Sequence, residues 1–192
     1  MNRLRFTKVR QVTTPSRGNV GDAGLDFYIP DNLSPEDMVL KNSSLVTMPN
    51  QSLVFNPDLP KNHVICVYNP DNKVEAIIIP PLHRILIPSG IRVLMEPANS
   101  MLTAANKSGV ATKLGLIYTA QIVDSPYTGE VHIGVLNTSS DFVILKPGQK
   151  LTQFIHIPIF DTTPEEISND EYDKLSVNWG TRGNNGFGST GE

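Results

Sequence analysis

The residues best suited to chemistry lie in the stretch QIVDSPYTGEVHIGV (121–135). Two arms with strand-like alternation flank a turn rich in Asp, Ser, Pro and Gly, a pattern typical of a β-hairpin. At the end of a strand, the carboxylate of Asp124 is suited to hold a water molecule as a general base, and Tyr127 is suited to present its ring to a ligand beside that water. The alternative is that Asp124 only caps the backbone of its own turn.

A second stretch, NKSGVATKLG (106–115), has the residue types of a phosphate-binding loop. Lys107 supplies a charge, Ser108 a hydroxyl, and Gly109 leaves backbone N–H groups accessible to an anion. The spacing does not match the nucleotide-binding loop with two glycines five apart followed by Lys-Ser/Thr. A solvated loop with a single helical turn is therefore the alternative.

Two more polar residues lie in segments with strand-like patterns. Asp26 stands between Leu25 and Phe27, and a carboxylate in such an apolar run needs a partner. A cation, or a water molecule on a metal ion, would supply one. Gln153 follows the turn at 147–150, and its amide can reach a phosphate oxygen or a backbone group.

The end of the sequence, RGNNGFGSTGE (182–192), is rich in glycine. One interpretation is a frayed terminus. The other is a mobile anion clamp, in which backbone N–H groups, the guanidinium of Arg182 and the hydroxyls of Ser189 and Thr190 meet phosphate oxygens. We expect such a clamp to be mobile when empty, because its glycines bury little apolar surface to offset the entropy of ordering.

The elements that must position these groups are short strands. Hydrophobic residues make up 39% of the 192 residues, with 15 prolines and 14 glycines, which favours a loop-rich β protein over a helical bundle. Strand-like runs cover residues 4–10, 25–29, 63–68, 74–79, 84–87, 91–95, 115–123, 131–137, 142–145 and 151–160. This spacing predicts an all-β sandwich or barrel. The sequence TPEE (163–166) predicts the start of a short helix.

The chain length predicts one β domain over residues 1–160, followed by a C-terminal arm over 161–192. Residues 31–80, rich in Pro and Asn, are expected to form an elaborated surface hairpin rather than a second domain. The single cysteine, the lack of a membrane span of about 20 apolar residues and the polar N-terminus predict a soluble, cytoplasmic protein. The net charge of −3 argues against a nucleic-acid-binding surface, and the scattered histidines argue against a zinc site.

Taken in order, five stretches resemble the motifs of the trimeric dUTPases, the deoxyuridine triphosphate nucleotidohydrolases. They are AGLDF (23–27), KSGVATKLG (107–115), IVDSPYTGE (122–130), PGQKLTQ (147–153) and RGNNGFGSTG (182–191). The resemblance implies a jelly-roll-like β-barrel and a homotrimer with threefold symmetry. It also implies active sites between subunits and an exchanged C-terminal arm that closes a neighbour's site.

The implied reaction is hydrolysis of dUTP to dUMP and pyrophosphate by attack of water on the α-phosphorus. This removes dUTP from the nucleotide pool and supplies dUMP for thymidylate synthesis. The resemblance implies a catalytic set of Asp124, Asp26, Gln153 and Arg182. It implies Mg²⁺ held mainly by the triphosphate, with Asp26 and Gln153 reaching the ion only through water. The substrate-binding residues it implies are Lys107, Ser108, Gly109, Gln121, Ile122, Tyr127, Arg182, Gly186, Phe187, Gly188 and Ser189.

In this resemblance, Tyr127 packs on the deoxyribose, Phe187 covers the base, and the 118–133 hairpin reads the uracil edge. The chain departs from the family pattern at two of these positions. Lys107 stands where Arg is usual, so a point charge replaces a bidentate fork. Gln121 stands where Gly is usual, which alters the rim of the uracil pocket. Residues 31–80 are longer than the usual segment and are expected to pack on the trimer surface or to bind another protein.

Two other functions are compatible with such a fold. A dCTP deaminase-like enzyme needs a catalytic Glu with a nearby Arg, whereas this chain has Asp124 and Tyr127 and lacks Arg in the second motif. A nucleotide-binding module acting on a protein partner would bind dUTP without turning it over. Its support is the 31–80 segment and Lys107, and a catalytic assay separates it from the enzyme.

Overall fold

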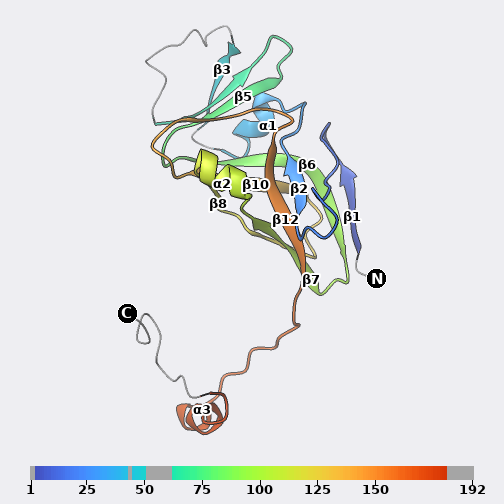
Figure 1. Cartoon of the computed structure of the whole chain (residues 1–192), viewed down its shortest axis with the longest axis vertical. Helices are drawn as coiled ribbons and strands as arrows, with labels where there is room; N and C mark the ends of the chain where they lie inside the picture. The colour runs from blue at the N-terminus through green and yellow to red at the C-terminus, as the bar shows by residue number, and fades with distance from the viewer. Residues whose placement is uncertain (1–2, 43–44, 51–61, 181–192) are drawn as a thin grey trace. The chain divides into compact units, whose positions relative to one another are not determined.

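The computed structural model describes residues 3–42, 45–50 and 62–180, which fold into strands and a few short helices (Figure 1). The chain divides into two compact units, Met1–Ile159 and Phe160–Glu192. No helix in the described ranges is both long and apolar enough to cross a membrane.

The first unit contains all the strands and two helices within the described ranges. The strands are β1 (Arg3–Lys8), β2 (Leu25–Tyr28), β3 (Leu45–Pro49), β4 (Val64–Tyr68), β5 (Val74–Ile79), β6 (Arg84–Glu96), β7 (Ser100–Ala105), β8 (Leu116–Tyr118), β9 (Ile122–Asp124), β10 (Glu130–Asn137), β11 (Val143–Leu145) and β12 (Lys150–Pro158). The helices are α1 (Pro35–Val39) and α2 (Ser108–Leu114). The all-β prediction is confirmed.

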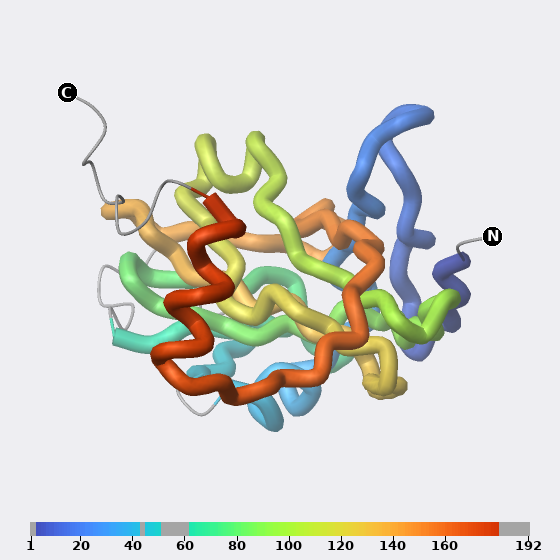
Figure 2. Tube along the Cα trace, turned by 90° about the horizontal axis from the view of Figure 1, so that it is seen from below, coloured from blue at the N-terminus to red at the C-terminus, as the bar shows by residue number. Residues whose placement is uncertain are grey.

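The strands form three four-stranded sheets, with the orders β1-β6-β10-β8, β11-β5-β4-β3 and β2-β12-β7-β9. Every pairing is antiparallel except that of β3 with β4. Several neighbours are distant in sequence, such as β1 with β6 and β2 with β12. Figure 2 shows the segment between β1 and β2 as a blue loop that extends from the strands.

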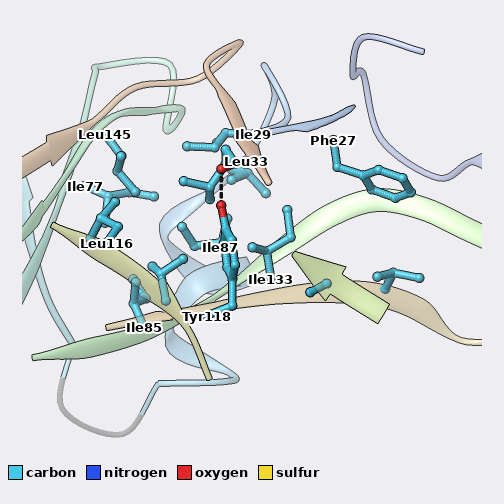
Figure 3. Close-up of a cluster of buried hydrophobic side chains, with 14 of the residues drawn as sticks. Phe27, Ile29, Leu33, Ile77, Ile85, Ile87, Leu116, Tyr118, Ile133 and Leu145 are labelled. Atoms are coloured by element: carbon cyan, nitrogen blue, oxygen red, sulfur yellow. Dashed lines mark hydrogen bonds between the residues drawn. The ribbon is translucent and has the colours of Figure 1, made fainter. Parts of the chain in front are cut away.

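Alternate residues of the three sheets point into one apolar core (Figure 3). Phe27 and Phe154 pack edge to face, with ring centroids 4.7 Å apart. The Tyr118 hydroxyl, deep in this core, donates to the carbonyl of Leu151, so its polar atom is satisfied. Burial raises the pKa of Tyr118. This hydrogen bond links β8 to β12, two strands of different sheets.

Two predicted strand boundaries are wrong. The runs 84–87 and 91–95 form one strand, β6, because the pairing with β10 shifts register between Glu130 and His132, where β6 has two extra residues, and Gly90 takes a positive φ of 73°. The run 115–123 splits instead into β8 and β9, which belong to different sheets.

Residues 31–80 include an antiparallel hairpin, as expected, and they belong to the first unit, but they are not confined to its surface. Strands β4 and β5 are an antiparallel pair, but β5 also pairs with β11 of the main unit. Apolar side chains of this segment belong to the common core: Leu33, Met38, Val64, Cys66, Val74, Ile77 and Ile79. Burial raises the pKa of the Cys66 thiol to about 12. The segment is thus a structural layer of the domain.

Helix positions differ from the sequence expectation in both units. In the first unit, α2 is longer than the single turn expected and ends at Gly115, whose φ of 65° suits glycine. In the second unit, the predicted start at 163–166 is wrong. Helix α3 (Asn169–Ser176) begins instead after Ser168, whose side chain accepts from the backbone N–H of Glu171.

Candidate functional site

The predicted phosphate-binding residues of three separate stretches lie together at the end of one sheet. Asp26 of β2 is in register with Gln153 of β12, and Gln153 is in register with Ala105 of β7. The chain leaves β7 directly into Lys107, the N-cap residue of α2. Strand pairing therefore brings Asp26, Lys107 and Gln153 together. With Lys150, which also contacts Asp26, these residues form what we call the cationic cluster.

Asp26 has the partners that its apolar neighbours predicted it would need. Its side chain is buried, and its two carboxylate oxygens accept from different ammonium groups. One donor is Lys107, and the other is Lys150, at 2.7 Å. Burial alone would raise the pKa of Asp26, but the two lysine hydrogen bonds outweigh it and lower that pKa. The same contact raises the pKa of Lys150.

Sequence reasoning missed Lys150, although the signal was present. It opens β12, three residues before Gln153, and a strand that begins with a cation and continues with a polar amide is unusual beside a buried core. With two lysines against one carboxylate, the cationic cluster carries a net positive charge. It is therefore suited to hold an anion.

Gln153 is oriented by its surroundings. Its amide nitrogen donates to the carbonyl of Asn106 at 3.0 Å. A β-carbon on Gly24 would lie 2.5 Å from the amide oxygen of Gln153, so only glycine leaves room for this side chain. In α2, a β-carbon on Gly109 would meet nothing within 4 Å. Open space therefore lies beside Ser108 and Gly109.

The hairpin predicted for 121–135 exists only at its base. Thr119 donates to Gly134 at 3.0 Å where β8 pairs with β10. Beyond that point the arms separate, because β9 pairs with β7 while β10 pairs with β6. The alternating pattern predicted strands correctly but does not specify the partner of each strand.

The separated arms enclose a cavity of about 340 Å³. We call it the Asp124 cavity, and its lining consists of Lys41, Leu86, Ala120, Ile122, Val123, Asp124, Tyr127, Val131 and His132. Asp124 and Tyr127 are joined by the turn, in which the Tyr127 N–H donates to the Asp124 carbonyl at 3.0 Å. The predicted residue Ile122 lines the cavity, while the Gln121 carbonyl accepts from Ala104 of β7 at 2.7 Å.

Glu130 holds Tyr127, a lining residue of this cavity, and sequence reasoning missed it. Its carboxylate accepts from the guanidinium of Arg10 at 2.8 and 3.2 Å and from the backbone N–H of Gly90 at 2.7 Å. Its carbonyl accepts from the Tyr127 hydroxyl at 2.8 Å. Arg10 also pairs with Asp37 at 2.8 Å. No local pattern signals this contact, because Arg10 and Glu130 are 120 residues apart.

The cationic cluster and Asp124 of the same chain lie far apart on one sheet. Asp124 is opposite Met101 of β7, whereas Gln153 is opposite Ala105. Four residues of strand and two strand spacings separate them by about 13 Å along and about 10 Å across the sheet, or roughly 16 Å in all. The predicted lid residues Arg182, Gly186, Phe187, Gly188 and Ser189 lie outside the described residues.

Comparison with known proteins identifies the family of this chain. The dUTPase family model matches residues 72–191, which include four of the five stretches identified above. Among curated relatives, the deoxyuridine 5'-triphosphate nucleotidohydrolase of Fusobacterium nucleatum is 33% identical over 123 residues, covering 63% of this chain and 79% of that protein. Its counterpart from Paramecium bursaria Chlorella virus 1 is 32% identical over 120 residues, covering 62% and 79%.

Solved structures show the same fold. A mutant dUTPase of Staphylococcus bacteriophage 80alpha with dUpNHpp matches with a TM-score of 0.64 and 17% identity over the whole of both chains. A mutant dUTPase from phage phi11 of S. aureus, which has a structural Mg(II) ion, matches with a TM-score of 0.59 and 14% identity, covering 87% of this chain and 97% of that one. The jelly-roll-like fold is confirmed. Because the family model matches more than half of its length, the chain belongs to the dUTPase family.

Proposed function

We propose that this protein hydrolyses dUTP to dUMP and pyrophosphate by attack of water on the α-phosphorus. The observation that carries the proposal is the Asp124 cavity, which has the size of a small-ligand site and is lined by both Asp124 and Tyr127. Membership of the dUTPase family and relatives named deoxyuridine 5'-triphosphate nucleotidohydrolase support it. The deaminase and binding-module alternatives are not favoured.

In this mechanism Asp124 holds and deprotonates the attacking water. Its carboxylate is exposed at the end of β9, so a water molecule can reach it. The ring of Tyr127, held through its hydroxyl by Glu130, supports the deoxyribose and leaves no space for a 2′-hydroxyl. The uracil lies deeper, between the backbones of the separated arms. Their N–H and C=O groups discriminate its edge from that of cytosine.

The phosphates bind the cationic cluster and the first turn of α2. Lys107 and Lys150 supply charge, while Ser108, Gly109 and Gln153 supply hydrogen-bond donors. Since phosphoryl transfer depends on positioning and charge neutralisation, Asp26 acts by orienting the two lysines. The buried carboxylate thereby fixes the charges that meet the triphosphate.

Mg²⁺ is proposed as the cofactor, and carboxylate and amide oxygens are ligand types that suit it. Within residues 3–42, 45–50 and 62–180, no three His, Cys, Asp or Glu side chains gather as a metal site requires. Both oxygens of Asp26 also bind lysines. We therefore propose an ion held mainly by the triphosphate, which Asp26 and Gln153 meet only through water. When bound, it would neutralise charge on the phosphates.

A homotrimer is proposed because one chain does not complete the site. A general base must lie within hydrogen-bond reach of the water it activates, about 3 Å, whereas roughly 16 Å separates Asp124 from Gln153 of its own cluster by strand spacing. Threefold closure would bring the Asp124 of one subunit to the cationic cluster of the next. Arg182, Phe187 and the glycines beside them would then close the site as a lid from an exchanged arm.

The test is release of pyrophosphate with Mg²⁺ from dUTP, dTTP, dCTP and UTP, by the wild type, Asp124→Asn and a matched control, Asp71→Asn, in the exposed β4–β5 turn. We expect a kcat/KM for dUTP far above that for the other three nucleotides, a loss of about 10³-fold or more in Asp124→Asn, as for removal of a central catalytic group, and no loss in the control. Binding of dUTP without release of pyrophosphate would instead identify a binding module, and conversion of dCTP to dUTP would identify a deaminase.

A further inference from the structure

We infer that Lys41 is a specificity-determining residue, which donates a hydrogen bond to the O4 carbonyl of uracil at the end of the Asp124 cavity beside Leu86. The inference rests on the proposed function for the identity of the nucleotide. Lys41 lies before residues 72–191, where the family model matches. Residues 31–80 would thus contribute directly to substrate recognition.

The neighbouring residue, Asn42, fixes the backbone at Lys41. Strand β1 pairs only with Ile91–Glu96 of β6, so the backbone groups of Leu86 that point away from β10 need another partner. Asn42 supplies both: its amide oxygen accepts from the Leu86 N–H at 2.8 Å, and its amide nitrogen donates to the Leu86 carbonyl at 2.9 Å. The same nitrogen donates to Met38 of α1 at 2.7 Å. Asn42 therefore docks the end of α1 on the cavity wall.

Strand register then gives the position of Lys41 along the cavity. Leu86 is opposite Gly134 of β10, whereas Arg92 is opposite Glu130, the residue that holds Tyr127. From Glu130 to Gly134 is about 13 Å of strand. Lys41 therefore lies at the end of the cavity away from Asp124 and Tyr127. A nucleotide with its sugar at Tyr127 directs the far edge of its base toward Lys41.

The two arms lie close together at Gly134, the residue opposite Leu86. A β-carbon on Gly134 would lie 2.5 Å from the Thr119 hydroxyl and 3.3 Å from the Ala120 nitrogen. A side chain at this position would collide with the arm that carries Ala120. Glycine thus keeps the two arms close at the base of the cavity, and Lys41 stands at the side of this narrow end.

The charge of Lys41 suits uracil and not cytosine. Lys41 is an exposed residue, and no ion pair within the described residues involves it. Of the other ionisable lining residues, Asp124 is at the opposite end, and His132 has its Nδ1 within 2.7 Å of the Glu130 carbonyl. An ammonium group only donates hydrogen bonds. It therefore favours the O4 acceptor of uracil and opposes the amino group that cytosine carries there.

The experiment compares Lys41→Met, Lys41→Arg and a matched control, Lys73→Met, in the β4–β5 turn. Steady-state release of pyrophosphate is measured with dUTP and with dCTP. We expect Lys41→Met to raise KM for dUTP about tenfold, the scale of one charged hydrogen bond, with kcat within about twofold. kcat/KM for dCTP should stay constant or rise, so that discrimination falls about tenfold. Lys41→Arg should keep the discrimination between dUTP and dCTP, and Lys73→Met should match the wild type.

An equal loss for both nucleotides, or unchanged discrimination in Lys41→Met, would overturn the inference, because a structural role affects both substrates alike. Titration with dUMP and dCMP separates this failure from failure of the proposed function. If the wild type releases no pyrophosphate from dUTP, the proposed function fails. Loss of dUMP preference in Lys41→Met would still support a uracil-reading lysine, and retained preference would reject it.

Discussion

The separation of Asp124 from the cationic cluster predicts that two inactive variants will restore each other. Chains with Asp124→Asn lack the general base but keep the cluster, and chains with Gln153→Ala keep the base but lack one phosphate-binding group. Because roughly 16 Å separates these residues within one chain by strand spacing, no active site should draw both from a single subunit. A mixed trimer should therefore contain sites in which both groups are intact.

The yield of restored sites follows from threefold symmetry. In a ring of three subunits that includes both variants, each site uses Asp124 of one subunit and Gln153 of the next. A mixed trimer contains two copies of one variant and one copy of the other. In either case, one of its three sites combines an intact Asp124 with an intact Gln153. Mixed trimers should therefore show about one third of wild-type kcat.

The assay uses coexpression of the two variants with different affinity tags, followed by purification on both tags in sequence. Each variant alone, purified in the same way, supplies the baseline, and unfolding curves show that both are folded. Activity of the mixed trimers at the level of the separate variants would refute the shared-site geometry. It would mean that Asp124 serves the cationic cluster of its own chain.

Two further predictions concern the fold. Ile77→Ala truncates a fully buried side chain of the 31–80 segment, so urea denaturation should show a loss of about 2–5 kcal/mol in the free energy of unfolding. A loss below about 0.5 kcal/mol would contradict a core position for this segment. Asp26 has a folded pKa below its ordinary value of 3.8, so its ion pairs stabilise the fold above that pH, and the stabilisation disappears as pH falls through the folded pKa. Asp26→Asn should therefore flatten the loss of unfolding free energy below about pH 4, and an unchanged acid slope would contradict the pairing with Lys107 and Lys150.

Features that depend on neighbouring residues in the sequence were the ones that local patterns could predict. The run 74–79 is β5 without any shift of boundary, because a series of β-branched residues between polar turns suits a strand. The need of Asp26 for a cation was predicted because an isolated carboxylate is costly in an apolar strand. The helix start was missed because Ser168 offers a competing cap, with Glu171 three residues on. These results depend on a few neighbouring residues.

Features that depend on distant partners were not predictable from such patterns. The strand-like arms on either side of Asp124 pair in different sheets, because β7 provides an edge for β9. Lys41 is held beside the Asp124 cavity by the bonds of its neighbour Asn42 to Leu86, 44 residues from Asn42. The Pro- and Asn-rich composition of 31–80 suggested a surface excursion, whereas its alternating apolar residues complete the core. Composition describes the turns of this segment, and tertiary contacts decide its place.

The contact between Arg10 and Glu130 affects when this part of the protein can fold during translation. The two residues are 120 positions apart, so at about 5–20 residues per second a ribosome needs roughly 6–24 s between them. During that interval Arg10 and Asp37 have left the ribosome without the carboxylate that joins them to β10. Strand β2 remains unpaired for even longer, because its partner is β12. The nascent chain thus acquires its binding groups only near the end of translation, and chaperones have a long window in which to hold its exposed strands.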